Sequence, residues 1–581
     1  FYRDRGYLKF SIESSQISLS RDKRSIFITF NVAEGEKYTI NNVNVIGDIP
    51  FKEETYKEIT NSLKDTTYSQ ATITSIEEFF TNILGNMGYA FAEVTGSTEL
   101  EEGSNEVGLI FSIQPGKKTY TRKILFTGNN ITQDYVLRRE MRQFEGAWTS
   151  DNSIEAGKVR LERLGYFKEV NVETIPVPGT DDQIDILYSV EEESTGSLGG
   201  NIGYSDFGLM LGFNLQEQNF LGTGNTVGIG INKNIYSEMY NVSFLNPYAT
   251  KDGVSLGYNI YSRETDYGEF KVANYLSNSY GFGAQFGYPI SDIQRLNFDI
   301  TYDKTDIDIG TLPAREIYDF VSAEGNVFET LSAGVSWQMV TLNRGLFPTD
   351  GSSTALSLSA TIPGSDINYY RINLRQRFYQ PLSSNFVFGF QGELGYLDSY
   401  GDTNETPFFQ NFYAGGPRSL RGFESNTLGP RSTDAPCYEF NYEEGTCPNL
   451  VDTDGDGEPD EPYYNPYASN NQRSRYRDAP IGGNIKVEGS MQLIFKLPFI
   501  EDQRSMRSAF FFDFGNVFSD NCKDYQINCY KPAVEDLRYS YGVGVTWITG
   551  FGPMSFAISK PTNAGPQERT EEFQFTVGNV F

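Results

Sequence analysis

The side chains on which enzyme chemistry usually depends are sparse in this chain. It has no histidine, which excludes a Ser-His-Asp triad, a Cys-His pair and any histidine-ligated metal. It also has no phosphate-cradling Gly-Lys-Ser/Thr loop, no Gly-x-Gly-x-x-Gly motif and no Gly-x-Ser-x-Gly motif. Paired carboxylates could still act as acid and base, but no arrangement of them points to such a site. We therefore predict that the protein is not an enzyme.

The four cysteines fall into two local pairs, Cys437 with Cys447 and Cys522 with Cys529. Both pairs lie in polar segments that we interpret as long surface loops. In an exported protein the surroundings are oxidising, so we expect a local disulfide within each pair. Free thiols are the alternative.

A short acidic run, DTDGDGEPD at 452–460, places Asp452, Asp454 and Asp456 at alternate positions, with Gly455 and Gly457 after the last two. Hard oxygen ligands at this spacing suit Ca²⁺, and the run resembles the calcium loops of thrombospondin-type repeats. It is not a full EF-hand, because Tyr463 stands where that loop has its glutamate. We favour a solvated acidic loop and keep calcium as the alternative. We expect no other cofactor.

The composition indicates a large β-rich protein. A chain of 581 residues is expected to form several domains. Its net charge of −29 argues against a nucleic-acid partner, because phosphate binding needs clustered Lys and Arg. An aromatic content of 15% argues against acidic disorder. No run of 18 apolar residues is present, but this leaves a transmembrane barrel possible, since barrel strands expose only alternate residues to lipid.

The first third of the chain contains a repeat. A Gly-Tyr pair recurs at intervals of 82 and 77 residues, beginning at Gly6, Gly88 and Gly165. Each unit has the pattern strand, helix, helix, strand, strand, and in the first full unit Ser69 is positioned to cap the second helix. The apolar stripes of these helices are what domain cores require, so the repeat itself is the informative signal. Since the sequence starts inside a repeat and has no signal peptide at Phe1, we expect it to be an N-terminally shortened form of a longer chain.

From about residue 194 the helical pattern gives way to alternating strands. In 537–547 every second residue is large and apolar, and the residues between them are small or polar; 508–518 and the final strand alternate in the same way, placing Phe518 outward and Asp513 inward. A soluble β-sandwich shows a similar alternation and is the alternative. The unbroken length, the aromatics at strand ends and the amphipathic last strand ending on Phe581 favour a membrane barrel, whose closure removes open edges.

Several segments, taken in order, resemble one family. Residues 138–148 read RREMRQFEGAW, 220–224 read FLGTG, 344–351 read RGLFPTDG and 415–423 read GGPRSLRGF. Together they resemble the BamA family of the POTRA-plus-barrel superfamily over essentially the whole chain. This resemblance implies α+β POTRA modules (βααββ) followed by an all-β transmembrane barrel of about 16 antiparallel strands. The expected domains are the C-terminal part of a POTRA domain at 1–37, a POTRA domain at 38–117, the last POTRA domain at 118–193 and the barrel at 194–581.

The resemblance also implies site residues. Leu420, Arg421, Gly422 and Phe423 match the family's [V/L]RGF motif, at the tip of a loop folded into the barrel. A guanidinium there needs an anionic partner, and Asp513 matches the family's acid. Where the family often has a second acid, this chain has Gln492, which leaves Arg421 more dependent on Asp513. The alternative is a solvated Arg421.

Glu140 falls in a helix of the last POTRA module, a region through which the family contacts the lipoprotein BamD. An ordinary exposed helix carboxylate is the alternative.

The resemblance implies an assembly factor that folds and inserts barrel proteins into the bacterial outer membrane without ATP, with its POTRA domains in the periplasm. Its partners would be accessory outer-membrane lipoproteins including BamD, unfolded outer-membrane clients, periplasmic chaperones and the lipid bilayer. The alternatives are a two-partner secretion pore, a TamA-like translocation-and-assembly relative, or a passive porin, although a porin would lack the POTRA repeats.

The junction between the first and last barrel strands, expected near 198–206 and 572–581, is predicted to be weak. Glycines in the first strand reduce side-chain packing and raise the entropic cost of ordering it. A weak seam would leave strand edges free for a client strand. Relief of crowding at the barrel entrance is the alternative role for these glycines. The seam residues are Gly199, Gly200, Ile202, Gly203, Tyr204, Phe573, Phe575, Val577, Gly578 and Phe581.

Overall fold

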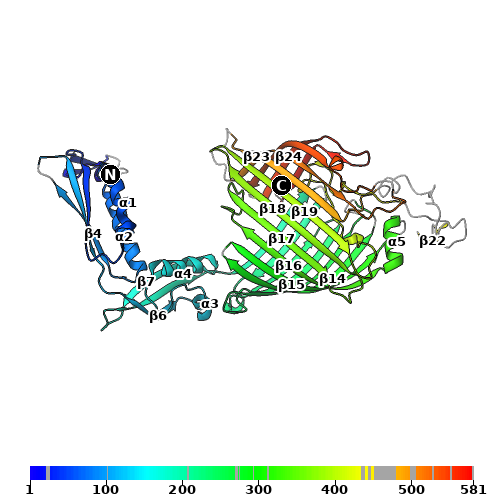
Figure 1. Cartoon of the computed structure of the whole chain (residues 1–581), viewed down its shortest axis with the longest axis horizontal. Coiled ribbons are helices and arrows are strands. Elements are labelled where there is room, and N and C mark those ends of the chain that lie inside the picture. Colours follow the sequence, from blue (N-terminus) through cyan, green and yellow to red (C-terminus); the bar gives the residue numbers. More distant parts are fainter. Residues whose placement is uncertain are drawn as a thin grey trace. The chain divides into compact units, whose positions relative to one another are not determined.

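A computed structural model describes most of the chain, and Figure 1 shows its elements. The described residues are all of 1–581 except 21–25, 101–102, 206–207, 269–271, 274, 292, 310–312, 434–438, 442–445, 450–478, 498–504, 527–528, 550–551 and 579–581. Within the described part, none of the helices combines the length and the apolar character that crossing a membrane requires.

The chain forms two compact units, the first over residues 1–195 and 221–223 and the second over 196–220 and 224–581. Two modules of the first unit share the order strand, helix, helix, strand, strand. In each module the last strand is the central one. It pairs in parallel with the first strand of the module and antiparallel with the second strand. The elements of the first module are β3 (Thr39–Gly47), α1 (Glu54–Leu63), α2 (Gln70–Asn86), β4 (Glu93–Leu100) and β5 (Glu106–Gln114). Those of the second are β6 (Tyr120–Thr127), α3 (Asp134–Arg138), α4 (Asp151–Arg163), β7 (Phe167–Pro176) and β8 (Gln183–Glu192). A short 3₁₀ turn, η1 (Arg3–Arg5), and the hairpin of β1 (Ser11–Leu19) and β2 (Ile26–Ala33) precede them.

The helical stripes predicted from the sequence form the module cores. Ile73, Ile76 and Phe80 of α2 are buried against β5, where Phe111 is fully buried. Ser69 caps α2, since its hydroxyl accepts a hydrogen bond from the Thr72 N–H at 3.3 Å. This capping satisfies one of the amide groups that the first helical turn leaves without a partner.

The second unit is a closed barrel of 16 antiparallel strands, as predicted. Neighbours along the chain pair with each other, and β9 returns to pair with β28, so that the sheet has no open edge. The strands are β9 (Gly196–Ser205), β10 (Gly208–Glu217), β11 (Thr226–Lys233), β12 (Ser237–Asn246), β13 (Ser255–Asp266), β14 (Leu276–Ser291), β15 (Gln294–Asp308), β16 (Val327–Val340), β17 (Gly351–Thr361), β18 (Tyr369–Pro381), β19 (Phe386–Ser399), β23 (Ile485–Phe495), β24 (Met506–Phe518), β25 (Arg538–Thr549), β26 (Gly552–Pro561) and β28 (Phe573–Val577).

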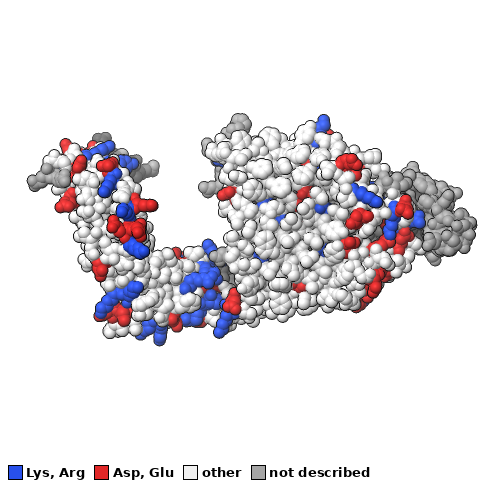
Figure 2. Space-filling model, viewed as in Figure 1, with Lys and Arg blue, Asp and Glu red and all other residues white. Residues whose placement is uncertain are grey.

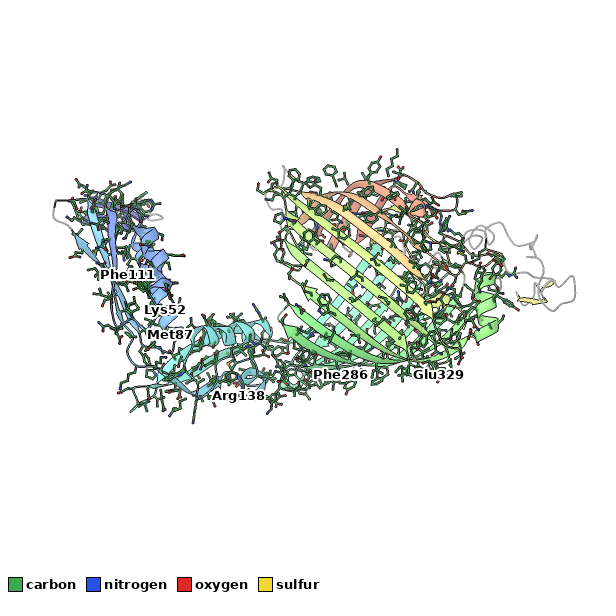
Figure 3. The ribbon with its side chains drawn as sticks, in the orientation of Figure 1. Lys52, Met87, Phe111, Arg138, Phe286 and Glu329 are labelled. Atoms are coloured by element: carbon green, nitrogen blue, oxygen red, sulfur yellow. A yellow bond between two sulfur atoms is a disulfide. The ribbon has the colours of Figure 1, made fainter. Side chains whose placement is uncertain are left out.

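Apolar side chains point out of the barrel and small or polar ones point in. On β25, Tyr541, Val543 and Trp547 are exposed, whereas Ser540 and Thr546 are buried. The visible wall in Figure 2 carries few charged side chains, and these gather at the rim beside α5 (Arg315–Glu324). Figure 3 shows Phe286 toward one end of the strands and Glu329 toward the α5 end. This charge-poor band is what lipid contact requires.

One predicted orientation is wrong. Phe518 was expected on the exposed face with Phe510 and Phe512, but it is 2% exposed. Phe518 is the last residue of β24, where the chain leaves the wall and enters the loop that contains Cys522. Alternation along a strand predicts exposure only within the wall, because a loop can cover the strand's end.

That loop is closed by a disulfide between Cys522 and Cys529, as predicted. Between the two cysteines, the Tyr525 hydroxyl donates to Asp319 of α5 at 2.8 Å, and the Arg315 guanidinium lies 4.1 Å from the centre of the Tyr525 ring. The loop therefore holds α5 at this end of the barrel.

Candidate functional site

The segment from about 411 to 432 lies inside the barrel and is anchored by apolar side chains. Leu420, Phe423 and Leu428 are fully buried in one cluster with Val517 of β24 and Leu397 of β19. The two-residue strand β20 (Gly422–Phe423) pairs with β27 (Thr570–Glu571), which directly precedes the last barrel strand. We call residues 411–432 the lumenal loop. Its packing fixes where the guanidinium of Arg421 lies.

Arg421 and Asp513 form a buried ion pair in the lumen. The Nε and Nη2 atoms of Arg421 each donate to one Asp513 oxygen at 2.7 Å, and the Arg421 backbone N–H donates to the same carboxylate at 3.2 Å. Arg421 is 5% exposed and Asp513 is fully buried. The guanidinium also lies 3.5 Å from the centre of the Phe511 ring, a cation–π contact. Two parallel hydrogen bonds define orientation as well as charge, so this geometry suits a rigid anchor.

Gln492 is linked to Arg421 by hydrogen bonds through Ser490. The Ser490 hydroxyl accepts from Nη2 of Arg421 at 2.9 Å, and the Gln492 amide donates to the same hydroxyl at 3.2 Å. Ser490 therefore stands between Arg421 and the position where the family often has its second acid. The alternation of β23 places Ser490 on the lumenal face, but the sequence offered no signal of its role.

The lumenal loop is also joined to the last strands of the barrel. The Gln574 amide of β28 donates to the Phe423 carbonyl at 2.8 Å, and its carbonyl accepts from the Gly422 N–H at 3.3 Å. Arg569 forms an ion pair with Glu424 of the loop at 3.3 Å. Gly422 has φ of +92°, and a Cβ there would lie 3.1 Å from the Ser559 hydroxyl. The turn thus needs glycine for both conformation and space.

The junction of β9 and β28 is paired at one register position among the described residues, Val577 opposite Tyr204. By contrast, β28 pairs with β26 over five positions and β9 pairs with β10 over ten. A Cβ on Gly578 would lie 3.1 Å from the Cα of Gly203, so the two backbones approach here because both residues are glycine.

The remaining predicted seam residues lie as the alternation suggested. Ile202 and Phe573 are exposed, whereas Gln574 and Thr576 are buried on the lumenal face. Gly199 and Gly200 lie on β9 opposite Asn214 and Phe213 of β10. Phe575 pairs with Phe556 of β26. Phe581 lies outside the described residues.

Glu140 is not the exposed helix carboxylate that was considered. It lies in the turn after α3 and is 3% exposed. Its carboxylate accepts from Nη2 of Arg160 on α4 at 2.6 Å, and Nε of Arg139 lies 3.7 Å from it. Because the carboxylate is enclosed by these cations, the structure presents Glu140 as part of the module's interior and not as a free contact surface.

Two predictions concern residues that the structure does not describe. Cys437 and the Cys447 side chain lie outside the described part, so the first disulfide stays a prediction. Asp452, Asp454 and Asp456 also lie outside it, so the calcium hypothesis remains a prediction. The described residues contain no group of three or more acidic or cysteine side chains that could hold a metal ion.

Comparison with known proteins identifies two kinds of domain. A family model described as the Omp85 superfamily domain matches residues 219–581. A POTRA model, described as a surface antigen variable number repeat, matches residues 38–116 and 119–193.

The chain is also similar to individual BamA proteins. The outer membrane protein assembly factor BamA of Neisseria meningitidis is 30% identical over 100% of this chain and 72% of its own length. BamA of Buchnera aphidicola is 29% identical over 57% of this chain and 56% of its own length. A crystal structure of Haemophilus ducreyi BamA lacking POTRA domains 1–3 matches with a TM-score of 0.75 and 31% identity, covering 93% of this chain and 99% of that one. The chain therefore belongs to the Omp85 superfamily and, within it, to the BamA family.

Proposed function

We propose that this protein folds and inserts β-barrel proteins into the bacterial outer membrane, where its own barrel resides with the POTRA modules in the periplasm. Its BamA relatives are named outer membrane protein assembly factors, which supports assembly over the secretion-pore alternative. The insertion route is the β9–β28 junction, and the energy comes from client folding and not from ATP. The chain has no nucleotide-binding motif, in agreement with this source of energy.

The observation that carries the proposal is the contrast between this junction and the rest of the wall. One register pair joins β9 to the described part of β28, so separating them breaks few backbone hydrogen bonds. The two glycines that meet there contribute no side-chain packing. Opening would expose the N–H and C=O groups of β9, which can then template a client strand. Closing a client strand against β9 satisfies these groups, which lipid cannot do.

The POTRA modules provide a second surface for extended chains. Both β3 and β4 are edge strands of their sheet, as are β6 and β7 of theirs. An edge strand can accept an unfolded client by β-augmentation, which gives affinity through the main chain without demanding one client sequence. Under this proposal the modules receive clients from periplasmic chaperones and dock accessory lipoproteins, BamD among them. Since Glu140 is buried, such docking would use neighbouring exposed side chains.

A cross-link across the junction tests the route. Because Val577 lies opposite Tyr204, these positions are the matched pair for a disulfide. Directly opposed residues of antiparallel strands are about 4.5–5.5 Å apart at Cα, within disulfide range. We expect Tyr204→Cys with Val577→Cys, once oxidised in proteoliposomes without ATP, to stop client insertion, and reduction to restore it.

The control is a cysteine pair in a fully paired part of the wall. Phe213 and Ile231 are opposed on β10 and β11, and both point outward. Phe213→Cys with Ile231→Cys should form its disulfide and leave insertion unchanged. This control also reports any effect of the reductant on the native disulfide. Full insertion activity with the Tyr204–Val577 pair quantitatively cross-linked would reject the lateral route.

A further inference from the structure

A cavity of about 210 Å³ opens in the barrel lumen beside the lumenal loop. Its wall is formed by β18, β19, β23 and the loop segment around Ser419. Four arginines line it, namely Arg375, Arg377, Arg418 and Arg421, with two carboxylates, those of Glu393 and Glu488. This is a concentration of cations in a chain whose net charge is −29.

Both carboxylates in the cavity wall already have cationic partners. Nε of Arg375 donates to Glu393 at 3.1 Å, and Nζ of Lys486 lies 3.2 Å from Glu393 and 3.0 Å from Glu488. The Ser419 hydroxyl donates to Glu488 as well. These contacts leave the two carboxylates little capacity to neutralise a further cation.

Arg421 is likewise neutralised by Asp513, so two arginines remain. Arg377 and Arg418 are both exposed and line the cavity, and within the described part of the chain neither has a carboxylate within 4.0 Å. Among the described residues, the four arginines and Lys486 set against Glu393, Glu488 and Asp513 give a local charge of +2, which Arg377 and Arg418 carry. Exposure to the lumen keeps them hydrated without a ligand.

We propose that this cavity binds an oxyanion, a carboxylate or a phosphate, held by Arg377 and Arg418. A guanidinium presents donors in a planar fork that matches both groups in bidentate fashion. The surrounding polar groups, among them Ser490 and Gln492, provide further donors at the cavity wall. The cavity volume is several times the ~30 Å³ that a water molecule occupies in the liquid, so it admits either anion with some of its hydration.

The test is calorimetric titration of the purified full chain in detergent micelles, at low chloride, with inorganic phosphate and separately with acetate. We expect saturable binding, weakened at least tenfold in the double variant Arg377→Gln with Arg418→Gln. Arg263→Gln, on the lumenal face of β13 and outside the cavity lining, is the matched control and should leave the affinity unchanged. Arg377→Lys with Arg418→Lys, which keeps the charge but loses the fork, should fall between the two.

The two anions distinguish the sources. Acetate binding and competition with phosphate would assign a carboxylate ligand, whereas phosphate binding that acetate does not displace would assign a phosphate. Lack of saturable binding of either anion at millimolar concentration, or equal affinity in the double variant and the unaltered chain, would overturn the proposal. Since binding is measured on this chain alone, that failure would leave the insertion proposal untouched.

Discussion

Removing the carboxylate of Asp513 should destabilise the barrel more than any other single change in the lumenal loop's surroundings. Asp513→Ala deletes three hydrogen bonds to Arg421, a residue that is only 5% exposed, and leaves its guanidinium with Ser490 and the Phe511 ring as neighbours. Removing one partner of a buried ion pair costs about 3–5 kcal/mol. Because Arg421 keeps its hydrogen bond to Ser490 and its contact with the Phe511 ring, we expect a loss at the low end of this range, about 3 kcal/mol.

The assay is urea unfolding of the chain folded into lipid vesicles, followed by tryptophan fluorescence. Gln492→Ala is the matched control, since Gln492 is also buried on the lumenal face but reaches Arg421 only through Ser490. It should cost about 1 kcal/mol, the usual net value of one hydrogen bond. In the double variant Arg421→Met with Asp513→Leu no buried charge is left unpaired, so it should be more stable than Asp513→Ala. The reasoning is refuted if Asp513→Ala loses less than Gln492→Ala.

Three further predictions concern other parts of the chain. Replacing Cys522 and Cys529 by serine should release the loop that holds α5 and increase its cleavage in limited proteolysis, without changing the unfolding of the barrel wall; unchanged cleavage would show that the side-chain contacts suffice. Ser69→Ala removes the cap of α2 and should cost about 1 kcal/mol, measured as faster hydrogen exchange in that helix while α4 stays unchanged. Burial acts to raise the pKa of Glu192, whereas hydrogen bonds from the N–H groups of 130–132 act to lower it. The hydrogen bonds have the larger combined effect, so the net shift of the pKa is downward. Because folding lowers this pKa, the ionised Glu192 stabilises the fold at pH above its ordinary value of 4.5. That contribution is lost as the pH falls through the lowered pKa, so acid should destabilise the last module. Glu192→Gln should reduce this pH dependence.

Alternation along strands predicted much of this molecule because lipid and lumen impose opposite demands on successive side chains. It placed Asp513, Gln574 and Thr576 on the lumenal face, where the structure has them buried. It could not say which loop atom each would meet, since those partners lie up to 152 residues away in the chain. It also failed for Phe518, which is buried at the end of β24 where the chain leaves the wall.

Glu140 shows a different limit of prediction from sequence. The resemblance placed it in a partner-contacting region, with an ordinary exposed carboxylate as the alternative, yet it is 3% exposed and pairs with Arg160 of α4. The two residues are 20 positions apart, on elements whose packing geometry the helical pattern alone does not define. Charge complementarity between separate helices was the available signal, but several other cations of the same module were equally plausible partners.

The lumenal loop is hydrogen-bonded to one strand of the β9–β28 junction and not, among the described residues, to the other. Through Arg421 it is anchored to β24, and through Gln574 to β28 itself, while Arg569 ties it to the segment that enters β28. No described residue of β9 is hydrogen-bonded to the loop, so β9 depends on β10 for its backbone pairing. Under the proposed lateral route, β9 would therefore move while β28 stays held from inside. This asymmetry predicts that Gln574→Ala, which frees β28 from the loop, changes the position of β28 and leaves the β9–β10 pairing intact. Hydrogen exchange of the two strands would separate these outcomes, and equal loosening of β9 and β28 would contradict the asymmetry.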